Sequence, residues 1–408
     1  REFETARPFR RSPVHDRLVA QGAVLGSKMG WERANVFAQP GTPAVLDYSW
    51  EAPSWLPWSR AEQAATRHTV GIFDQTSFAK YLVTGPHAAA SLQWLCTADV
   101  DVPVGRAVYT GMLNGRGGYE ADVTVTRLGQ AEFLVVSGAA SAVRDVDWIR
   151  RRAPQDHRTE VVDVTPMYAV FGVMGPASRE LLGRLSGADL SDGGFPFSTS
   201  RHLRIGTATV RATRITYVGE LGWELYVPTE FAAGVYEDLL SAGESLGAVP
   251  AGYYTIDAMR LEKGYRAFGR ELVPDATPVE AGLTFTCKLG SGIDFLGRQA
   301  VEQVKAAGPA RRIVSVVAGD PAAYLWSGEL LLRDGEPAGQ VTSAGWGHAL
   351  GAPVGLAWAV DRQTGRVTPE WLRSGTFEVD LAGRRVPVTV SLRPPFDPEG
   401  VRLGRDSA

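Results

Sequence analysis

The chain contains 408 residues, of which 44% are hydrophobic and 21% are charged, and its formal net charge is -3. This length exceeds what one compact core normally holds, so we expect two or three packed subdomains. The slightly acidic net charge and the scattered basic residues argue against a nucleic-acid partner. The sequence has no run of about 18 apolar residues, so no membrane span is predicted.

The two cysteines, Cys96 and Cys287, lie in the apolar contexts "SLQWLCTAD" and "LTFTCKLG". They are predicted to be buried thiols rather than a disulfide, which favours an intracellular, cytoplasmic protein. The histidines show no ligand spacing, so no metal site is predicted. Neither a GxGxxG nor a Walker-type GxxxxGKS/T motif occurs, so no dinucleotide or phosphate-binding loop is expected.

The first predicted element is a short helix over residues 13–21, followed by a loop and a Trp-containing turn in "GAVLGSKMGWERANVF". The Pro- and Trp-rich stretch "SWEAPSWLPW" predicts an irregular loop. The start of a helix is predicted over residues 60–66, with Ser59 as the N-cap. "AKYLVTGPHAAASLQWL" then predicts a strand, a Gly-Pro turn and a helix.

Alternating segments predict a three-stranded meander in "RAVYTGMLN", "ADVTVTRLG" and "AEFLVVSG", and a helix in "RDVDWIRRRAP". "TEVVDVTPMYAVFGVMGPAS" repeats the earlier strand, Gly-Pro turn and helix, which suggests a duplicated α+β unit. "TATVRATRITYVGELGWELYVP" predicts a hairpin, and "EFAAGVYEDLLSAGE" an amphipathic helix.

From "RRIVSVVAGD" onward we expect helices to stop, because short strands alternate with Gly, Asp and Pro turns as in a small β-barrel or sandwich. A boundary is therefore expected near residues 306–312. The predicted division is a linker-like extension at 1–47, a main domain of two α+β subdomains at 48–305, a β-barrel at 306–395, and a flexible tail at 396–408.

Three segments combine aromatic, acidic and basic residues, and each has an ordinary structural explanation. Asp122, which follows the glycines of "NGRGGYEAD", could be an acid that binds N–H groups of a turn. Glu220 and Glu224 of "YVGELGWEL" could be exposed strand residues, and Tyr217 and Trp223 beside them could be core. Arg260 and Glu262 of "RLEKGY" could belong to a surface helix.

Taken in order, the segments "NGRGGYEAD", "YVGELGWE", "RLEKGY", "PVEAGL" and "DFLGRQA" resemble the aminomethyltransferase (T-protein) family of the glycine cleavage system. "RRSPVHDRLVAQGAVLGSKMGWERANVF" resembles in particular the stretch that joins the flavin half to the folate half of dimethylglycine and sarcosine dehydrogenases and oxidases. The resemblance implies an α+β fold of three subdomains, a cloverleaf around a central channel for tetrahydrofolate, with a C-terminal β-barrel.

By position in these motifs, Asp122 matches the family's essential acid beside the reactive folate nitrogens. Tyr109 and Tyr217 match folate-channel tyrosines, Glu224 the acid that binds the pterin, and Arg260 a helix arginine near the folate. A carboxylate can accept paired N–H donors from a reduced pterin. Asp122 is expected to stay ionised, held by hydrogen-bond donors, to take a proton or stabilise a cation.

The sequence departs from the family pattern at two places. Gly138 in "VVSG" stands where the T-protein has Asn, and Ala121 precedes Asp122 where the family has a second acid. With Gly138, one polar folate contact of the family is missing or supplied elsewhere. The single acid disfavours a lipoyl-bound aminomethyl substrate and is compatible with the demethylating branch. "EKGYRAFGRE" also lacks the Cys of the tRNA-modifying branch.

The resemblance implies a tetrahydrofolate-dependent one-carbon transferase or demethylase. It would move a methyl-derived carbon, as an iminium or formaldehyde equivalent, from a small methylated amine to tetrahydrofolate. The flavin half is not in this sequence. It lies on a separate flavin-dependent amine dehydrogenase or oxidase subunit, or the sequence is part of a longer protein, or the protein is a stand-alone member with a different methyl donor. The alternatives are a stand-alone O-, S- or N-demethylase or methyltransferase without flavin, and a non-catalytic folate-binding module.

Overall fold

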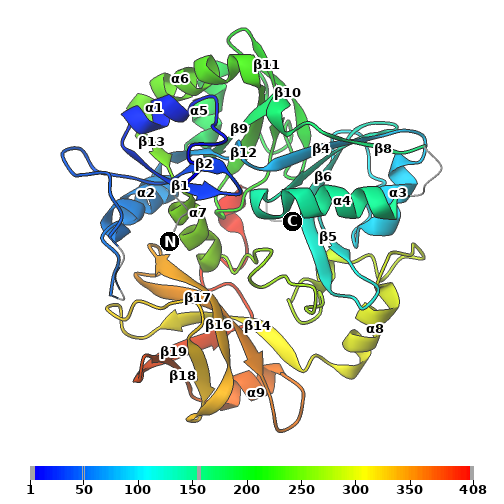
Figure 1. Ribbon diagram of the computed structural model, residues 1–408, viewed down its shortest axis with the longest axis vertical. Helices are drawn as coiled ribbons and strands as arrows, with labels where there is room; N and C mark the ends of the chain where they lie inside the picture. The colour runs from blue at the N-terminus through cyan, green and yellow to red at the C-terminus, as the bar shows by residue number, and fades with distance from the viewer. Residues whose placement is uncertain (1–4, 48, 50, 154–157, 405–408) are drawn as a thin grey trace.

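Three lobes, each built on its own β-sheet, surround the centre of the molecule in the computed structural model of the protein (Figure 1). The structure describes residues 5–47, 49, 51–153 and 158–404. The arrangement confirms the predicted α+β cloverleaf with a C-terminal β-barrel. Within the described ranges, no helix is long and apolar enough to cross a membrane.

The first lobe contains a six-stranded sheet with the order β10-β11-β12-β9-β3-β13. Its strands are β3 (Val70–Asp74), β9 (Tyr168–Met174), β10 (Ser200–Ile205), β11 (Ala208–Thr213), β12 (Gly222–Pro228) and β13 (Ala248–Ala251). Helices α5 (Ser178–Leu185) and α6 (Ala232–Gly243) bury Leu182 and Leu239 in one core with Val173 and Leu225 of the strands. This apolar face forms because every second residue of β12, from Trp223 onward, points to it.

The second lobe contains a five-stranded sheet with the order β5-β6-β7-β4-β8. Its strands are β4 (Ala79–Thr84), β5 (Ala107–Leu113), β6 (Tyr119–Gly129), β7 (Glu132–Ser137) and β8 (Glu160–Asp163). Helices α3 (Ala88–Leu95) and α4 (Ala142–Arg152) share its core, where Leu92 and Ile149 lie with Val123 and Phe133. The predicted meander and both helices are confirmed.

The two lobes repeat one unit of chain: strand, helix, three-stranded meander, helix, strand. The unit runs from β4 to β8 in the second lobe and from β9 to β13 in the first. The strand orders match except that β3 lies between β9 and β13. The duplication suggested by the two Gly-Pro turns is therefore present in the topology.

The third lobe is a closed barrel with the order β14-β17-β16-β15-β18-β19. Its strands are β14 (Arg311–Ala318), β15 (Leu330–Arg333), β16 (Glu336–Gly347), β17 (Ala352–Val360), β18 (Phe377–Leu381) and β19 (Arg384–Ser391), and α8 (Arg298–Ala307) precedes it. The expectation that helices stop here is wrong, because α9 (Pro369–Ser374) follows Thr368. The hydroxyl of that residue caps the helix by accepting a hydrogen bond from Trp371 N at 3.1 Å.

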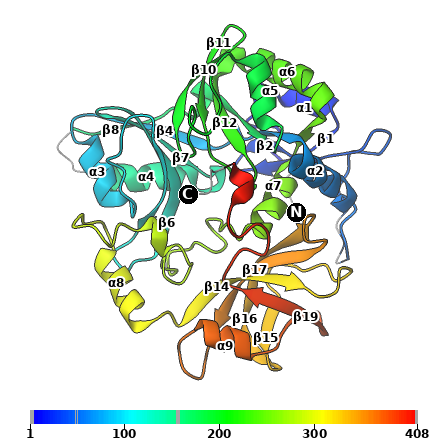
Figure 2. The ribbon, with the colours of Figure 1, turned by 180° about the vertical axis from the view of Figure 1, so that it is seen from behind.

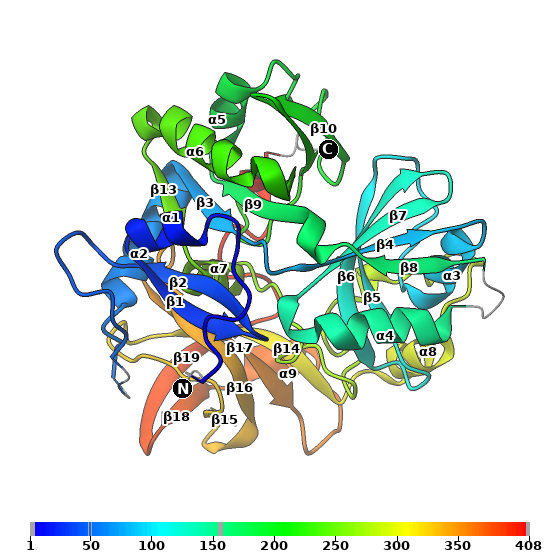
Figure 3. The same cartoon turned by 45° about the horizontal axis from the view of Figure 1, so that its top comes forward.

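The first residues of the chain differ most from the sequence-based expectation. After α1 (His15–Ala20), the predicted loop and turn are an antiparallel hairpin of β1 (Ala23–Lys28) and β2 (Trp31–Phe37) (Figure 3). The described part of the predicted linker packs into the first lobe, where Val14 and Phe37 join the core. Because β2 is buried on both faces, it lacks the polar alternation that marks a strand.

Helix α2 (Leu56–His68) begins before the predicted start. Its first turn contains Pro57, and Ser59 is not an N-cap but lies inside the helix, where its hydroxyl is 3.2 Å from that of Thr255. That threonine belongs to α7 (Tyr253–Glu262), which packs against α2, β2 and β16 at the centre of the molecule (Figure 1). Helix α7 is therefore buried between the first lobe and the barrel rather than lying on a surface.

The segment after β19 returns from the barrel to the centre, where it forms a short 3-10 turn at Val401–Leu403 (Figure 2). Leu403 is buried, and its carbonyl accepts a hydrogen bond from Arg214 Nη2 at 3.4 Å. The predicted flexibility is therefore wrong for residues 396–404, and residues 405–408 lie outside the described residues.

Candidate active site

Asp122 lies within strand β6, and its register determines what surrounds it. Its cross-strand partner on β5 is Gly111, so no side chain stands directly opposite the carboxyl group. Tyr109, which pairs with Thr124, points to the same face from the diagonal position. The phenol of Tyr109 donates a hydrogen bond to Asp122 Oδ2 at 3.3 Å, and 42% of this tyrosine is exposed.

The glycine-rich turn before Asp122 is stabilised by Asn114 rather than by Asp122. Asn114 Oδ1 accepts hydrogen bonds from Arg116 N at 2.9 Å and from Gly118 N at 3.2 Å. The interpretation of Asp122 as a turn acid is therefore wrong.

The preceding residue, Ala121, faces the apolar core of the second lobe, so an acid at that position would point away from Asp122.

The electrostatics of Asp122 differ from the expectation of a permanently ionised acid. Burial, and next the charge of Asp145, raise the pKa of Asp122 to about 7, while the hydrogen bond from Tyr109 lowers it. Asp122 is partly accessible as a residue. A carboxyl group with this pKa is poised to exchange protons near neutral pH.

Asp145 on α4 is a neighbour that the sequence did not reveal. It is fully buried, its Oδ2 accepts a hydrogen bond from Ser141 Oγ at 2.7 Å, and its Oδ1 has no partner among the described residues. Burial raises its pKa to about 6. In the sequence it is one polar residue of an amphipathic helix, and nothing there indicates that it turns inward.

Tyr217 lies on the loop between β11 and β12, in the first lobe. Its hydroxyl donates a hydrogen bond to the carbonyl of Arg266 at 2.7 Å, and its ring stacks on that of Tyr265 with centroids 5.9 Å apart. The charges of Arg260 and Asp122 both act on its hydroxyl. Tyr217 therefore lies within electrostatic range of Tyr109, Asp122 and Arg260, which come from the second lobe and α7.

Arg260 is fully buried, which contradicts the surface-helix interpretation. Its Nε donates to Asp257 Oδ1 at 2.9 Å, and its Nη1 donates to the carbonyl of Tyr265 at 2.9 Å and to Glu271 Oε2 at 3.1 Å. Its Nη2 has no partner in the part of the chain that the structure describes. Glu271, which the sequence did not indicate, thus helps to fix the guanidinium.

Glu224 lies on β12 and faces away from the helices of the first lobe, opposite Trp223 and Leu225. Only 6% of it is exposed, so the interpretation as an exposed strand residue is wrong. Tyr226 donates a hydrogen bond to its Oε2 at 2.7 Å. Burial raises the pKa of Glu224, while this hydrogen bond and the charge of the buried Lys80 oppose the shift. Its described surroundings are distinct from those of Asp122.

Gly138, the other departure from the family pattern, has ordinary extended backbone with a φ of -67°. A Cβ there would meet no atom within 4 Å. The structure therefore does not require glycine at this position.

A separate pocket of about 310 Å³, open solvent included, lies where α2 and α7 meet the barrel. Trp55, Tyr254, Tyr324 and Trp346 line it together with Asp257, which also binds Arg260. Asp122 is not part of its lining, so the chemistry is argued from the Asp122 cluster rather than from this pocket.

Comparison with known proteins identifies the family and the fold. The family model of the GCVT N-terminal domain matches residues 14–291, and that of the glycine cleavage T-protein C-terminal barrel domain matches residues 311–397. The crystal structure of glycine cleavage system aminomethyltransferase T from Bartonella henselae superposes with a TM-score of 0.80 over 95% of this chain and 98% of that chain, at 24% identity. This match shows the shared fold.

Two curated relatives are longer than the chain. It is 40% identical to 4-methylaminobutanoate oxidase (formaldehyde-forming) of Paenarthrobacter nicotinovorans, over 98% of this chain and 48% of the relative. It is 35% identical to the mitochondrial pyruvate dehydrogenase phosphatase regulatory subunit of Mus musculus, over 96% of this chain and 46% of the relative. The chain thus spans about half the length of these relatives. With both family models matched in order, the chain belongs to the glycine cleavage T-protein (GCVT) family.

Proposed function

We propose that the chain is a tetrahydrofolate-dependent one-carbon transferase that moves a methyl-derived carbon from a small methylated amine to tetrahydrofolate. The observation that carries this proposal is the cluster of Asp122, Tyr109, Tyr217 and Arg260, in which a carboxyl group has a pKa of about 7. A carboxyl group tuned to neutral pH suits general acid–base chemistry rather than a structural ion pair.

The residues present fit a reduced folate. Glu224 has a carboxylate oxygen, Oε1, beyond the one that Tyr226 occupies, and a buried carboxylate is a strong acceptor for the N–H groups of a pterin. The free Nη2 of Arg260 and the hydroxyl of Tyr119, which also lacks a described partner, are buried donors. The exposed ring of Tyr109 offers an aromatic face for stacking.

Bound tetrahydrofolate would supply the nucleophilic nitrogen that takes up the carbon. The Asp122 carboxylate would accept the proton released when that nitrogen–carbon bond forms, and could return it to the amine or hydroxyl group that leaves the carbon, because its pKa of about 7 suits both steps near neutral pH. Tyr109 orients the carboxylate through its hydrogen bond. Arg260, fixed by Asp257 and Glu271, keeps a positive charge beside Tyr217.

The carbon must arrive at the oxidation level of formaldehyde, so an N-methyl group has to lose two electrons elsewhere. We propose that a separate flavin-dependent amine dehydrogenase or oxidase accepts them and delivers the iminium or formaldehyde. The name of one relative, 4-methylaminobutanoate oxidase (formaldehyde-forming), supports this step.

A non-catalytic folate-binding module is the second candidate, and the likeness to a regulatory subunit favours it. The test incubates the full chain with tetrahydrofolate and either formaldehyde or a panel of methylated amines and ethers, and follows the folate products by mass. Accelerated uptake of formaldehyde carbon supports the proposed transferase. Turnover of a methyl compound without an oxidase points instead to a stand-alone demethylase, and binding without any product points to the module.

A further inference from the structure

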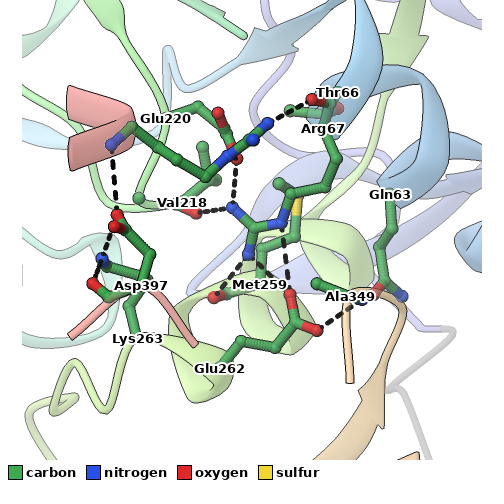
Figure 4. Close-up of polar contacts among 12 residues, drawn as sticks. Gln63, Thr66, Arg67, Val218, Glu220, Met259, Glu262, Lys263, Ala349 and Asp397 are labelled. Carbon is green, nitrogen blue, oxygen red and sulfur yellow. Dashed lines mark hydrogen bonds and ion pairs between the residues drawn. The ribbon is translucent and has the colours of Figure 1, made fainter. Parts of the chain in front are cut away.

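Six charged residues form a buried network that the proposed chemistry does not use. The guanidinium of Arg67 lies between two carboxylates, 2.7 Å from Glu220 and 2.6 Å from Glu262 (Figure 4). Arg402 reaches Glu220 at 2.7 Å from the other side, and Lys263 binds Asp397 at 2.8 Å. Glu220 and Glu262 are 1% and 0% exposed. Three of these residues belong to the motifs "YVGELGWE" and "RLEKGY".

The network joins segments that are far apart in the sequence. Arg67 comes from α2, Glu262 and Lys263 from the end of α7, and Asp397 and Arg402 from the segment after the barrel. Glu262 also accepts a hydrogen bond from the backbone N–H of Ala349, at 2.7 Å, in the turn between β16 and β17. The first lobe, α7 and the barrel are thereby connected to the same charges.

The loop that carries Tyr217 is held by this network on one side. Arg67 Nη1 donates hydrogen bonds to the carbonyl of Val218, at 2.8 Å, and to Glu220, so one guanidinium binds two residues of the loop. Between them, Gly219 has a φ of +76°, and a Cβ there would collide with the side chain of Lys263. Residues 218–220 therefore pack closely against Lys263 at the end of α7, and Tyr217 is the residue directly before them.

Arg402 is the most exposed of the six residues in the network. Its side chain is 36% exposed, whereas that of Arg67 is 3% exposed. Arg67 serves both Glu220 and Glu262, so loss of Arg402 leaves two buried carboxylates with one guanidinium between them. A buried carboxylate that loses a charged partner destabilises the folded state. We expect the loop that carries Glu220 to respond by opening locally, so that the carboxylate reaches solvent.

We propose that Arg402 is a positioning residue, which sets the loop of Tyr217 through Glu220 and so couples docking of the segment 396–404 to occupancy of the ligand site. The inference rests on the proposed function only for the identity of the ligand, tetrahydrofolate. Coupling between two sites is reciprocal, so a ligand that uses Tyr217 must also strengthen docking of that segment by the same factor.

The test compares the full chain with the variants Arg402→Met and Arg402→Lys by amide hydrogen exchange. Arg402→Met is expected to speed exchange over residues 215–221 about tenfold, while the barrel strands stay protected and Arg402→Lys recovers part of the protection. The matched control is Arg393→Met, just before this segment, because the side chains of Arg393 and of its ion-pair partner Glu399 are 66% and 72% exposed. Equal exchange of 215–221 in Arg402→Met and the parent chain would overturn the inference, as would faster exchange spread evenly over all lobes.

A second measurement addresses the coupling. Tetrahydrofolate titrated into the parent chain and Arg402→Met, well below their melting temperatures, should bind about tenfold more weakly to the variant. Tetrahydrofolate should slow exchange of 396–404 in the parent chain by a similar factor. Equal affinities overturn the coupling. A parent chain that binds no tetrahydrofolate overturns the proposed function and the coupling to it, and the exchange of 215–221 still decides whether Arg402 holds the loop.

Discussion

The phenol of Tyr109 donates a hydrogen bond to Asp122 Oδ2 at 3.3 Å, diagonally across the paired strands β5 and β6. The residue directly opposite Asp122 is Gly111, so this diagonal partner, rather than a facing side chain, orients the carboxylate. Such an arrangement leaves the acid accessible while fixing its direction, which is what a group that exchanges protons with a bound reactant needs.

Asp122→Asn is expected to stabilise the protein at neutral and alkaline pH. Because the folded-state pKa is raised from 3.8 to about 7, the contribution of Asp122 to stability is fully present below about pH 4 and is lost as pH rises through about 7. The Asn variant does not suffer this loss, so its melting temperature should exceed that of the parent chain at pH 8 but not at pH 4. Thermal unfolding across this range measures the difference.

The control for this experiment is Asp147→Asn on α4, whose carboxylate is 51% exposed in an ion pair with Arg151. A surface pair of this kind contributes about 0–1 kcal/mol, so its effect should be small and without the same rise with pH. Identical pH trends for the two variants would show that Asp122 is not the perturbed acid.

Tyr109→Phe is expected to keep the aromatic ring and to shift the activity profile toward higher pH. The hydrogen bond from Tyr109 lowers the pKa of Asp122. Its removal should therefore raise that pKa further, so that the carboxylate forms at a higher pH. The pH dependence of kcat/KM measures this shift. Tyr324→Phe, in the separate pocket, should leave the profile unchanged, and an unshifted profile in Tyr109→Phe would remove the phenol from the mechanism.

Glu224→Gln is expected chiefly to weaken binding of tetrahydrofolate. Replacing a charged acceptor by a neutral amide costs about 1.5–3 kcal/mol per hydrogen bond, which corresponds to roughly 10- to 150-fold in Kd. Calorimetric titration of the variant, beside an Asp147→Asn control, measures the loss. An affinity equal to that of the parent chain would place the pterin elsewhere.

The ordered motifs predicted the cloverleaf through the family resemblance that they carry. The duplication was indicated by the residues themselves, because the repeated strand, Gly-Pro turn and helix form a local pattern. Buried elements were harder. Strand β2 was missed because burial on both faces erases polar alternation, and α9 was missed although the Thr-Pro pair before it is an N-cap signal.

Long-range contacts could not be predicted from the sequence at all. Asp145 approaches Asp122 only because α4 packs on the sheet of β6, and Glu271 meets Arg260 only through a turn after α7. The segment 396–404 was predicted to be flexible because it contains Pro and Gly. In the structure, Arg402 and Asp397 of this segment form ion pairs with the buried residues Glu220 and Lys263. Charges that looked like exposed residues, such as Glu220, are partners of distant arginines.

The most direct test of the account is the rate at which the chain transfers isotopically labelled carbon from formaldehyde to tetrahydrofolate, corrected for the uncatalysed reaction and compared with Asp122→Asn. General acid–base catalysis by Asp122 predicts a rate about 10²- to 10⁴-fold lower in the variant, with tetrahydrofolate affinity within several-fold of the parent. A fully active Asn variant, or a parent chain no faster than the uncatalysed reaction, would contradict the account.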